Sequence, residues 1–136
     1  MTTQPPIPAD APAAIRHYHA HVYYDPASSR EQAARLRERV AAAFPQARLG
    51  RWHDAPVGPH TRSMYQIAFP PGILASFLPW LLLNRDGLTV LLHPGTGDAY
   101  ADHTAHAAWL GGMLPLRLDV LRRAGEGEGE GEGKAD

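Results

Sequence analysis

The chain has 136 residues, a formal net charge of -1 and no cysteine. This length suits one domain with a single hydrophobic core, and the small charge gives no electrostatic reason to expect nucleic acid as a partner. The lack of cysteine excludes disulfides and thiolate metal ligands and fits a reducing cytoplasm. No apolar run approaches the roughly 20 residues of a membrane span, and no secretory signal is evident. We therefore expect a soluble cytoplasmic protein that binds neither nucleic acid nor membrane.

The two ends of the sequence differ from the middle in composition. Residues 1–14 are rich in Pro and Ala, and residues 125–136 consist largely of Gly and Glu. Neither segment has the large apolar side chains that a hydrophobic core needs. We predict a disordered N-terminal lead-in over 1–14, a single domain over 15–124 and a disordered Gly/Glu-rich tail over 125–136.

The first predicted strand covers residues 17–25, with the sequence HYHAHVYYD. Successive side chains of a strand point to opposite faces, so His17, His19 and His21 share one face while smaller and apolar neighbours occupy the other. Imidazole is the commonest protein ligand for transition metals, but two or three alternating histidines do not by themselves make a site. On this pattern alone, a metal site and a half-exposed polar sheet face are equally consistent.

The rest of the sequence alternates between helical and strand-like periodicity. The predicted elements are, in order, a helix over 29–44, strands over 47–52 and 63–69, a helix over 73–84, a strand over 88–93, a short helix from Asp102 to Trp109 and an extended segment over 114–120. The first six elements, counted from the opening strand, follow the order strand, helix, strand, strand, helix, strand. We therefore predict an α+β fold, a ferredoxin-like βαββαβ sandwich with an appended short helix and a C-terminal extended segment, in which both long helices cover one sheet face.

The predicted topology brings distant histidines together. In this fold the first and last strands of the βαββαβ unit are neighbours, which sets His19 and His21 beside His93. His60 ends a loop stiffened by two prolines, and His103 follows the strand of His93, so both can reach the same face. Converging neutral imidazoles predict a site for a first-row divalent metal. The alternative is a buried, hydrogen-bonded histidine cluster without a metal.

Six short motifs occur in a fixed order along the chain. They are His-Val-Tyr-Tyr at 21–24, Pro-Val-Gly-Pro-His at 56–60, Pro-Trp with Asn-Arg within 79–85, His-Pro-Gly-Thr-Gly-Asp at 93–98, Asp-His-Thr at 102–104 and Trp-Leu-Gly at 109–111. In these motifs the chain resembles the small DOPA 4,5-dioxygenases and their bacterial relatives, over roughly residues 17–121. The resemblance implies a non-haem iron(II) extradiol dioxygenase that opens the ring of a catechol, either DOPA or a related compound, with O2.

Extradiol cleavage needs a metal with open coordination positions for catechol and O2, which three protein ligands would leave. We predict His21, His60 and His93 as the ligands of Fe(II), although zinc or another divalent metal could occupy the site in purified protein. His19 and His103 are predicted to transfer protons as general acid or base, a role that suits imidazole. The iron triad of two histidines and one carboxylate is not obvious in this sequence.

Three aromatic residues are predicted to line a pocket for the small aromatic substrate, namely Tyr23, Trp52 and Trp109.

A homodimer is expected. Two other interpretations use the same sequence features. One is a ferredoxin-like dimeric module that binds a ligand or a partner without catalysis. The other is a zinc-dependent hydrolase that uses the same histidines.

Overall fold

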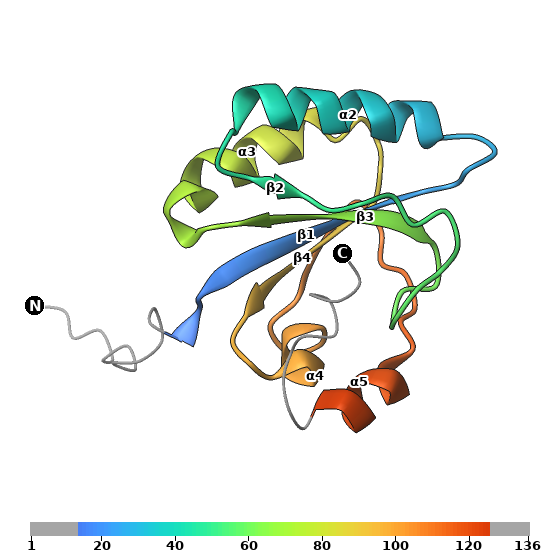
Figure 1. Cartoon of the computed structure of the whole chain (residues 1–136), viewed down its shortest axis with the longest axis vertical. Coiled ribbons are helices and arrows are strands. Elements are labelled where there is room, and N and C mark those ends of the chain that lie inside the picture. Colours follow the sequence, from blue (N-terminus) through green and yellow to red (C-terminus); the bar gives the residue numbers. More distant parts are fainter. Residues whose placement is uncertain (1–13, 126–136) are drawn as a thin grey trace, which may run out of the picture.

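The computed structural model describes residues 14–125, which form a five-stranded sheet with helices on both sides (Figure 1). The elements are β1 (His17–Tyr24), α2 (Arg30–Ala43), β2 (Arg48–Leu49), β3 (Ser63–Phe69), the 3-10 helix η1 (Pro71–Ile73), α3 (Leu74–Asn84), β4 (Val90–Gly95), α4 (Ala99–Asp102), β5 (Ala108–Leu110) and α5 (Leu118–Gly125). The disorder predicted for residues 1–13 and 126–136 lies outside the described residues, and the domain boundaries stay a prediction.

The sheet has the strand order β2-β3-β1-β4-β5, and every neighbouring pair is antiparallel. Its first four strands have the order of a ferredoxin-like βαββαβ fold, so the predicted fold class is confirmed. Strand β1 lies between β3 and β4, and its residue His19 is paired directly with His93 of β4. The added strand β5 pairs with the outer side of β4, which places β4 inside the sheet.

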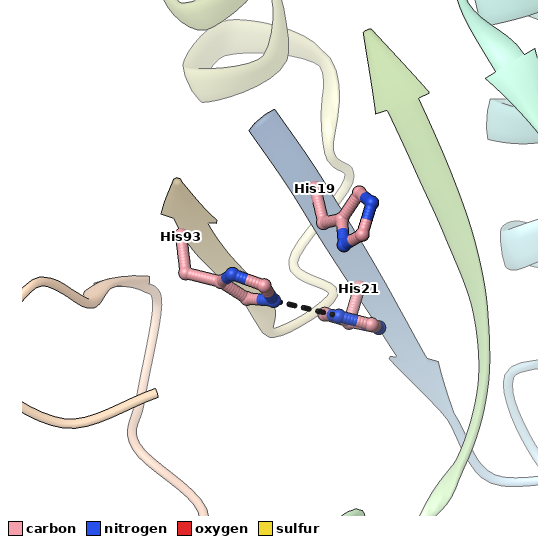
Figure 2. A group of neighbouring side chains, drawn as sticks. All are labelled: His19, His21 and His93. Carbon is pink, nitrogen blue, oxygen red and sulfur yellow. Dashed lines mark hydrogen bonds between the residues drawn. The ribbon is translucent and has the colours of Figure 1, made fainter. Parts of the chain in front are cut away.

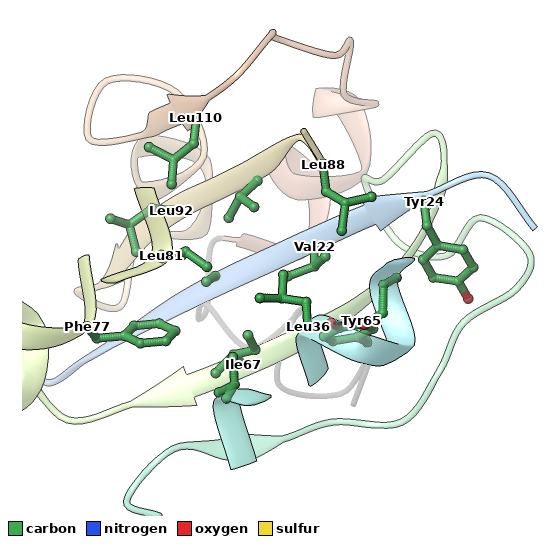
Figure 3. Close-up of a cluster of buried hydrophobic side chains, with 14 of the residues drawn as sticks. Val22, Tyr24, Leu36, Tyr65, Ile67, Phe77, Leu81, Leu88, Leu92 and Leu110 are labelled. Atoms are coloured by element: carbon green, nitrogen blue, oxygen red, sulfur yellow. Dashed lines mark hydrogen bonds between the residues drawn. The ribbon is translucent and has the colours of Figure 1, made fainter. Parts of the chain in front are cut away.

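One face of the sheet carries the main hydrophobic core. Alternate residues of β1, such as Val22, point toward helices α2 and α3, and both helices lie over this face as predicted (Figures 1 and 3). Helix α2 buries Leu36 and Val40 at the helical spacing seen in the sequence. Helix α3 buries Phe77 and Leu81 and continues through Pro79, which is exposed. At an exposed position, water can satisfy the backbone carbonyl that a proline leaves without an amide partner.

Two predictions for the C-terminal third are wrong. Asp102 does not start a helix that reaches Trp109. Helix α4 ends at Asp102, its cap is Asp98, and residues 108–110 form β5. The open edge of β4 needs hydrogen-bond partners, and β5 supplies them. The predicted extended segment is extended only as far as Arg117, because residues from 118 onward form α5, which buries Leu121.

The second face of the sheet is covered by the chain that follows β4. Helices α4 and α5 lie on the side opposite α2 and α3 (Figure 1). The segment before α5 is tied to the loop before β3, because Leu116 pairs with His60 and the Arg117 amide donates a 2.8 Å hydrogen bond to the Pro59 carbonyl. The predicted sandwich has its long helices on one face only, whereas in the structure this second face is also partly enclosed. Among residues 14–125, no helix has the length and apolar content needed to cross a membrane.

We expect Phe77→Ala to lower the free energy of unfolding by about 3–5 kcal/mol, because the ring is fully buried and its removal leaves a cavity. Leu83→Ala on the same helix is the matched control, since Leu83 is 85% exposed and its loss should change stability by no more than about 0.5 kcal/mol. Urea unfolding of both variants measures the difference. Equal effects would contradict the assignment of the core to this face.

Candidate metal centre

Three histidines from two neighbouring strands lie side by side on the second face of the sheet (Figure 2). His19 and His21 come from β1 and His93 comes from β4. Strand alternation points all three away from the main core, and the pairing of β1 with β4 places them together. All three side chains are buried. The predicted meeting of these residues therefore occurs in the structure, although His93 lies within β4 and not at its end.

Two further histidines reach the same place from outside the sheet. His60 lies just before β3, where its bridge to Leu116 and the hydrogen bond from its amide to the Val57 carbonyl hold the backbone. His103 directly follows Asp102 as the C-cap residue of α4. Both are buried, and their rings lie 4.2 Å from those of His21 and His93, respectively. The five residues His19, His21, His60, His93 and His103 are called the histidine cluster below.

Within the cluster, two sets of three histidines each bring one ring nitrogen per residue within 4.8 Å of the others. The sets are His19, His21 and His93, and His21, His60 and His103. His21 belongs to both. The ligand set predicted from the sequence, His21, His60 and His93, is divided between them. Ligand nitrogens around one ion lie at most about 4.2 Å apart, twice a metal-nitrogen bond of about 2.1 Å, so small ring rotations would allow either set to bind.

Hydrogen bonds to backbone carbonyls define which nitrogen of two rings carries the proton. The Nδ1 of His93 lies 2.8 Å from the Pro94 carbonyl, and the Nδ1 of His103 lies 2.8 Å from the Ala99 carbonyl. A carbonyl only accepts, so each Nδ1–H donates and each Nε2 keeps a lone pair. The Nε2 of His21 lies 3.1 Å from the Nε2 of His93 (Figure 2). His21 must then donate through Nε2, which leaves its lone pair on Nδ1.

The Nδ1 atom of His21 is buried and has no hydrogen-bond partner among the described residues. The same holds for the Nε2 atom of His60. The other nitrogen of His60, Nδ1, lies 2.7 Å from the Tyr23 hydroxyl. Nδ1 of His19 is a third such atom. Buried polar atoms usually have a partner, so these nitrogens are consistent with ligand atoms for a cation.

Burial keeps the cluster neutral. Loss of solvation, helped by the repulsion between protonated imidazoles of neighbouring histidines, lowers the pKa of His19 and of His60 to about 3. The pKa values of His21 and His93 lie well below the ordinary 6.5 for the same two reasons, desolvation first. Burial also lowers the pKa of His103, against the opposing effects of the Ala99 carbonyl and the Asp102 carboxylate. Metal binding requires neutral imidazole.

The donor atoms of both sets are imidazole nitrogens alone. Such sets suit Zn, Cu, Fe and Ni better than the oxygen-preferring Mg and Ca. The nearest carboxylate in the sequence, Asp102, is buried but is hydrogen-bonded to Thr96. The residues present therefore fit a first-row transition metal held by nitrogen.

The three predicted pocket residues occupy different places. Tyr23 and Trp109 lie on the cluster's side of the sheet, with stacked rings 6.0 Å apart. Trp52 is not brought to the cluster, because its ring packs edge-on to Tyr65 in the core on the other face, under the Arg30 guanidinium. Cavities of about 280 and 360 Å³ lie past the end of β1. Tyr23 lines the smaller cavity, and neither tryptophan lines either one.

Two residues beside the cluster were not predicted from the sequence. Gln66 is buried directly opposite His21 in the pairing of β1 with β3. The alternation of the predicted strand over 63–69 could have identified Gln66, because it places Gln66 on the same face as Met64. Asp102 was predicted only as the start of a short helix, and its hydrogen bonds to Thr96 depend on a contact that periodicity does not reveal.

Residues 18–120 match the model of the Dopa 4,5-dioxygenase family. The chain is 36% identical over 117 residues to an uncharacterized 21.2 kDa protein of Botryotinia fuckeliana, covering 78% of this chain and 63% of the relative. It is 34% identical over 111 residues to a DOPA 4,5-dioxygenase of Amanita muscaria, covering 76% and 49%, respectively. The chain thus spans about half to two thirds of the length of these relatives.

A solved structure is also similar. A crystal structure from Nostoc punctiforme, described as a candidate dioxygenase, superposes with a TM-score of 0.80 at 50% sequence identity. The match covers 82% of this chain and 96% of that one. This degree of identity extends the likeness beyond the fold to most of the sequence.

We expect acid to destabilise the metal-free protein. The folded-state pKa values of His19 and His60 are about 3, and the ordinary value is 6.5. Below pH 6.5 the unfolded chain takes up protons that the folded cluster refuses, so stability present above this pH is lost as pH falls toward 3. One such histidine accounts for about 2 kcal/mol between pH 6.5 and pH 5.

Urea unfolding at several pH values between about 8 and 5 measures this loss. His19→Gln should reduce the slope, because one titrating group is removed while a polar side chain is kept. A free energy of unfolding that does not change over this range would contradict the buried, neutral state of the cluster.

Proposed function

The chain belongs to the Dopa 4,5-dioxygenase family, and from this premise we propose that it is a non-haem iron(II)-dependent extradiol dioxygenase that opens the ring of a catechol-type substrate with O2. The observation that carries the proposal is the buried cluster of five neutral histidines on one sheet face. Its all-nitrogen donor set suits a redox-active first-row metal. Both family and site thus support the same chemistry, and DOPA or a related catechol is the proposed substrate.

For the metal ligands we favour Nδ1 of His21, Nε2 of His60 and Nε2 of His103. A histidine that binds a metal usually donates its other N–H to an oxygen or another acceptor, which orients the ring. Each of these three has such a partner at its second nitrogen. His21 has His93 Nε2 at 3.1 Å, His60 has the Tyr23 hydroxyl at 2.7 Å, and His103 has the Ala99 carbonyl at 2.8 Å.

This assignment keeps His21 and His60 from the set predicted by sequence and exchanges the roles of His93 and His103. In the other set, His93 Nδ1 donates to the Pro94 carbonyl, and its Nε2 lone pair already accepts the 3.1 Å hydrogen bond from His21 Nε2. His93 would then act on the metal through His21. Three protein ligands leave coordination positions open, and bound iron(II) would supply the sites for catechol and O2 and the electron transfer between them.

The remaining residues would bind the substrate and move protons. A catechol must lose hydroxyl protons to chelate, and His19 offers a buried, neutral imidazole whose ring centroid lies 5.2 Å from that of His93. We propose His19 as the group that accepts and later returns a proton. Tyr23 and Trp109, whose rings stack on the same side of the sheet, would provide an aromatic wall for the substrate.

Zinc-dependent hydrolysis is the second candidate, because imidazole-only sites with an open position also suit catalytic zinc. The metal taken up and the products formed decide between the two. The homodimer and the cytoplasmic location stay predictions from sequence.

His21→Ala should abolish binding of Fe(II) or Co(II), because His21 belongs to both sets of converging histidines and two remaining ligands cannot hold the ion. His60→Ala and His103→Ala should also lose the metal, whereas His93→Ala should keep it with an affinity reduced by about 10–100-fold. Equilibrium dialysis with metal analysis gives the stoichiometry and affinity of each variant.

The matched control is His53→Ala, since His53 belongs to neither set. If the His19 and His93 variants lose the metal while the His60 and His103 variants keep it, the ion is bound by the other set, His19, His21 and His93. Full binding in all single variants, His21→Ala included, would contradict a metal site in this cluster.

Anaerobically iron-loaded protein should convert a catechol and O2 to a yellow ring-opened product. The zinc-loaded protein should not, because zinc has no accessible redox change. His19→Ala should retain iron and slow turnover by about 100-fold or more, the usual effect of losing a general acid or base. Stoichiometric iron without turnover of any catechol in a panel would contradict the dioxygenase proposal.

A further inference from the structure

The Asp102 carboxylate lies beside the cluster, is buried, and has no part in the ligand sets. Its Oδ2 accepts a 2.9 Å hydrogen bond from the Thr96 backbone amide, and its Oδ1 accepts a 2.7 Å hydrogen bond from the Thr96 hydroxyl. The Nδ1 of the half-exposed His106 lies 3.1 Å from the same Oδ1. Hydrogen bonds to a carboxylate are the stronger kind, so these contacts tie Thr96 firmly to Asp102.

The two tied residues belong to different segments of the site. Thr96 lies three positions after His93, just past the end of β4, and Asp102 immediately precedes His103. Their hydrogen bonds therefore join the segment that carries His93 to the segment that carries His103, whose rings lie 4.2 Å apart.

Helix α4, which His103 follows directly as the C-cap, has only four residues. A helix this short does not persist on its own, because too few hydrogen bonds offset the cost of nucleation. Outside contacts must hold it in place. The Asp98 side chain accepts a 3.1 Å hydrogen bond from the Ala101 amide and so caps the first turn. Of the two aspartates, it is Asp102 that binds the residue just after β4, Thr96.

We propose that Asp102 is a positioning residue for the metal site, which clamps α4 to the end of β4 through Thr96 and thereby sets His103 at ligand distance. This inference rests on the proposed metal site and adds to it a residue that touches neither metal nor substrate. Burial of the carboxylate is accounted for by the two hydrogen bonds from Thr96. Without them α4 would still be joined to α5 by the 2.8 Å hydrogen bond from Arg122 to the Tyr100 hydroxyl, but it would lose this tie to the end of β4, and the His103 ring would shift away from His21 and His60.

The test measures Co(II) affinity by competition and the Co(II) ligand-field spectrum, together with the melting temperature. Asp102→Ala should weaken binding about 10–100-fold and change the spectrum. Asp102→Asn should restore most of the affinity, because a rotated amide can accept from the Thr96 amide and donate to its hydroxyl. Thr96→Val removes one hydrogen bond and should weaken binding about fivefold, so the clamp can be tested even where Asp102→Ala does not fold.

The matched control is Asp98→Ala, which loosens the start of α4 but leaves the bonds to Thr96. It should bind Co(II) as the wild type does. Equal losses of affinity in Asp98→Ala and Asp102→Ala, or a lower melting temperature in Asp102→Ala with unchanged affinity and spectrum, would overturn the positioning role. Failure of the wild type to bind Co(II) would overturn the metal site itself, and the clamp with it.

Discussion

Desolvation of imidazole is the constraint on which the second face of the sheet depends. Each histidine of the cluster is buried among others, so a proton on one ring raises the free energy of all its neighbours. The rings therefore stay neutral, and binding of a cation requires this neutral state as well. A neutral ring must place its single N–H on an acceptor, and a cation requires the lone pairs to meet at one point.

Atoms outside the cluster supply hydrogen-bond partners for three of its five rings. The carbonyls of Pro94 and Ala99 and the hydroxyl of Tyr23 engage the outward-facing nitrogens of three rings. The remaining lone pairs are thereby directed inward. Under the proposed function this has a chemical consequence. Ligands that are all neutral leave the charge of a divalent ion uncompensated, and an anionic chelate such as a deprotonated catechol is then favoured over a neutral molecule.

The fold assigns the two faces of the sheet to different tasks. Helices α2 and α3 cover the apolar face (Figures 1 and 3). Trp52 packs against this core and not at the cluster. The short elements that follow β4 cover the other face, and individual contacts hold them in place. The bridge between Leu116 and His60 and the bonds between Asp102 and Thr96 are such contacts. Site geometry on this face thus depends on a few polar interactions more than on packed area.

Local periodicity was enough to predict the strand over 17–25, its shared histidine face and the ferredoxin-like order of elements, because alternation and helical spacing are properties of neighbouring residues. The meeting of His19 and His21 with His93 followed from that order. Periodicity could not divide His60 and His93 between two ligand sets or turn Trp52 toward the helices. It also could not identify residues 108–110 as the strand that closes the edge of β4. These outcomes depend on ring rotations, tautomers and hydrogen-bond partners that are distant in sequence, and such contacts exist only once the chain has folded.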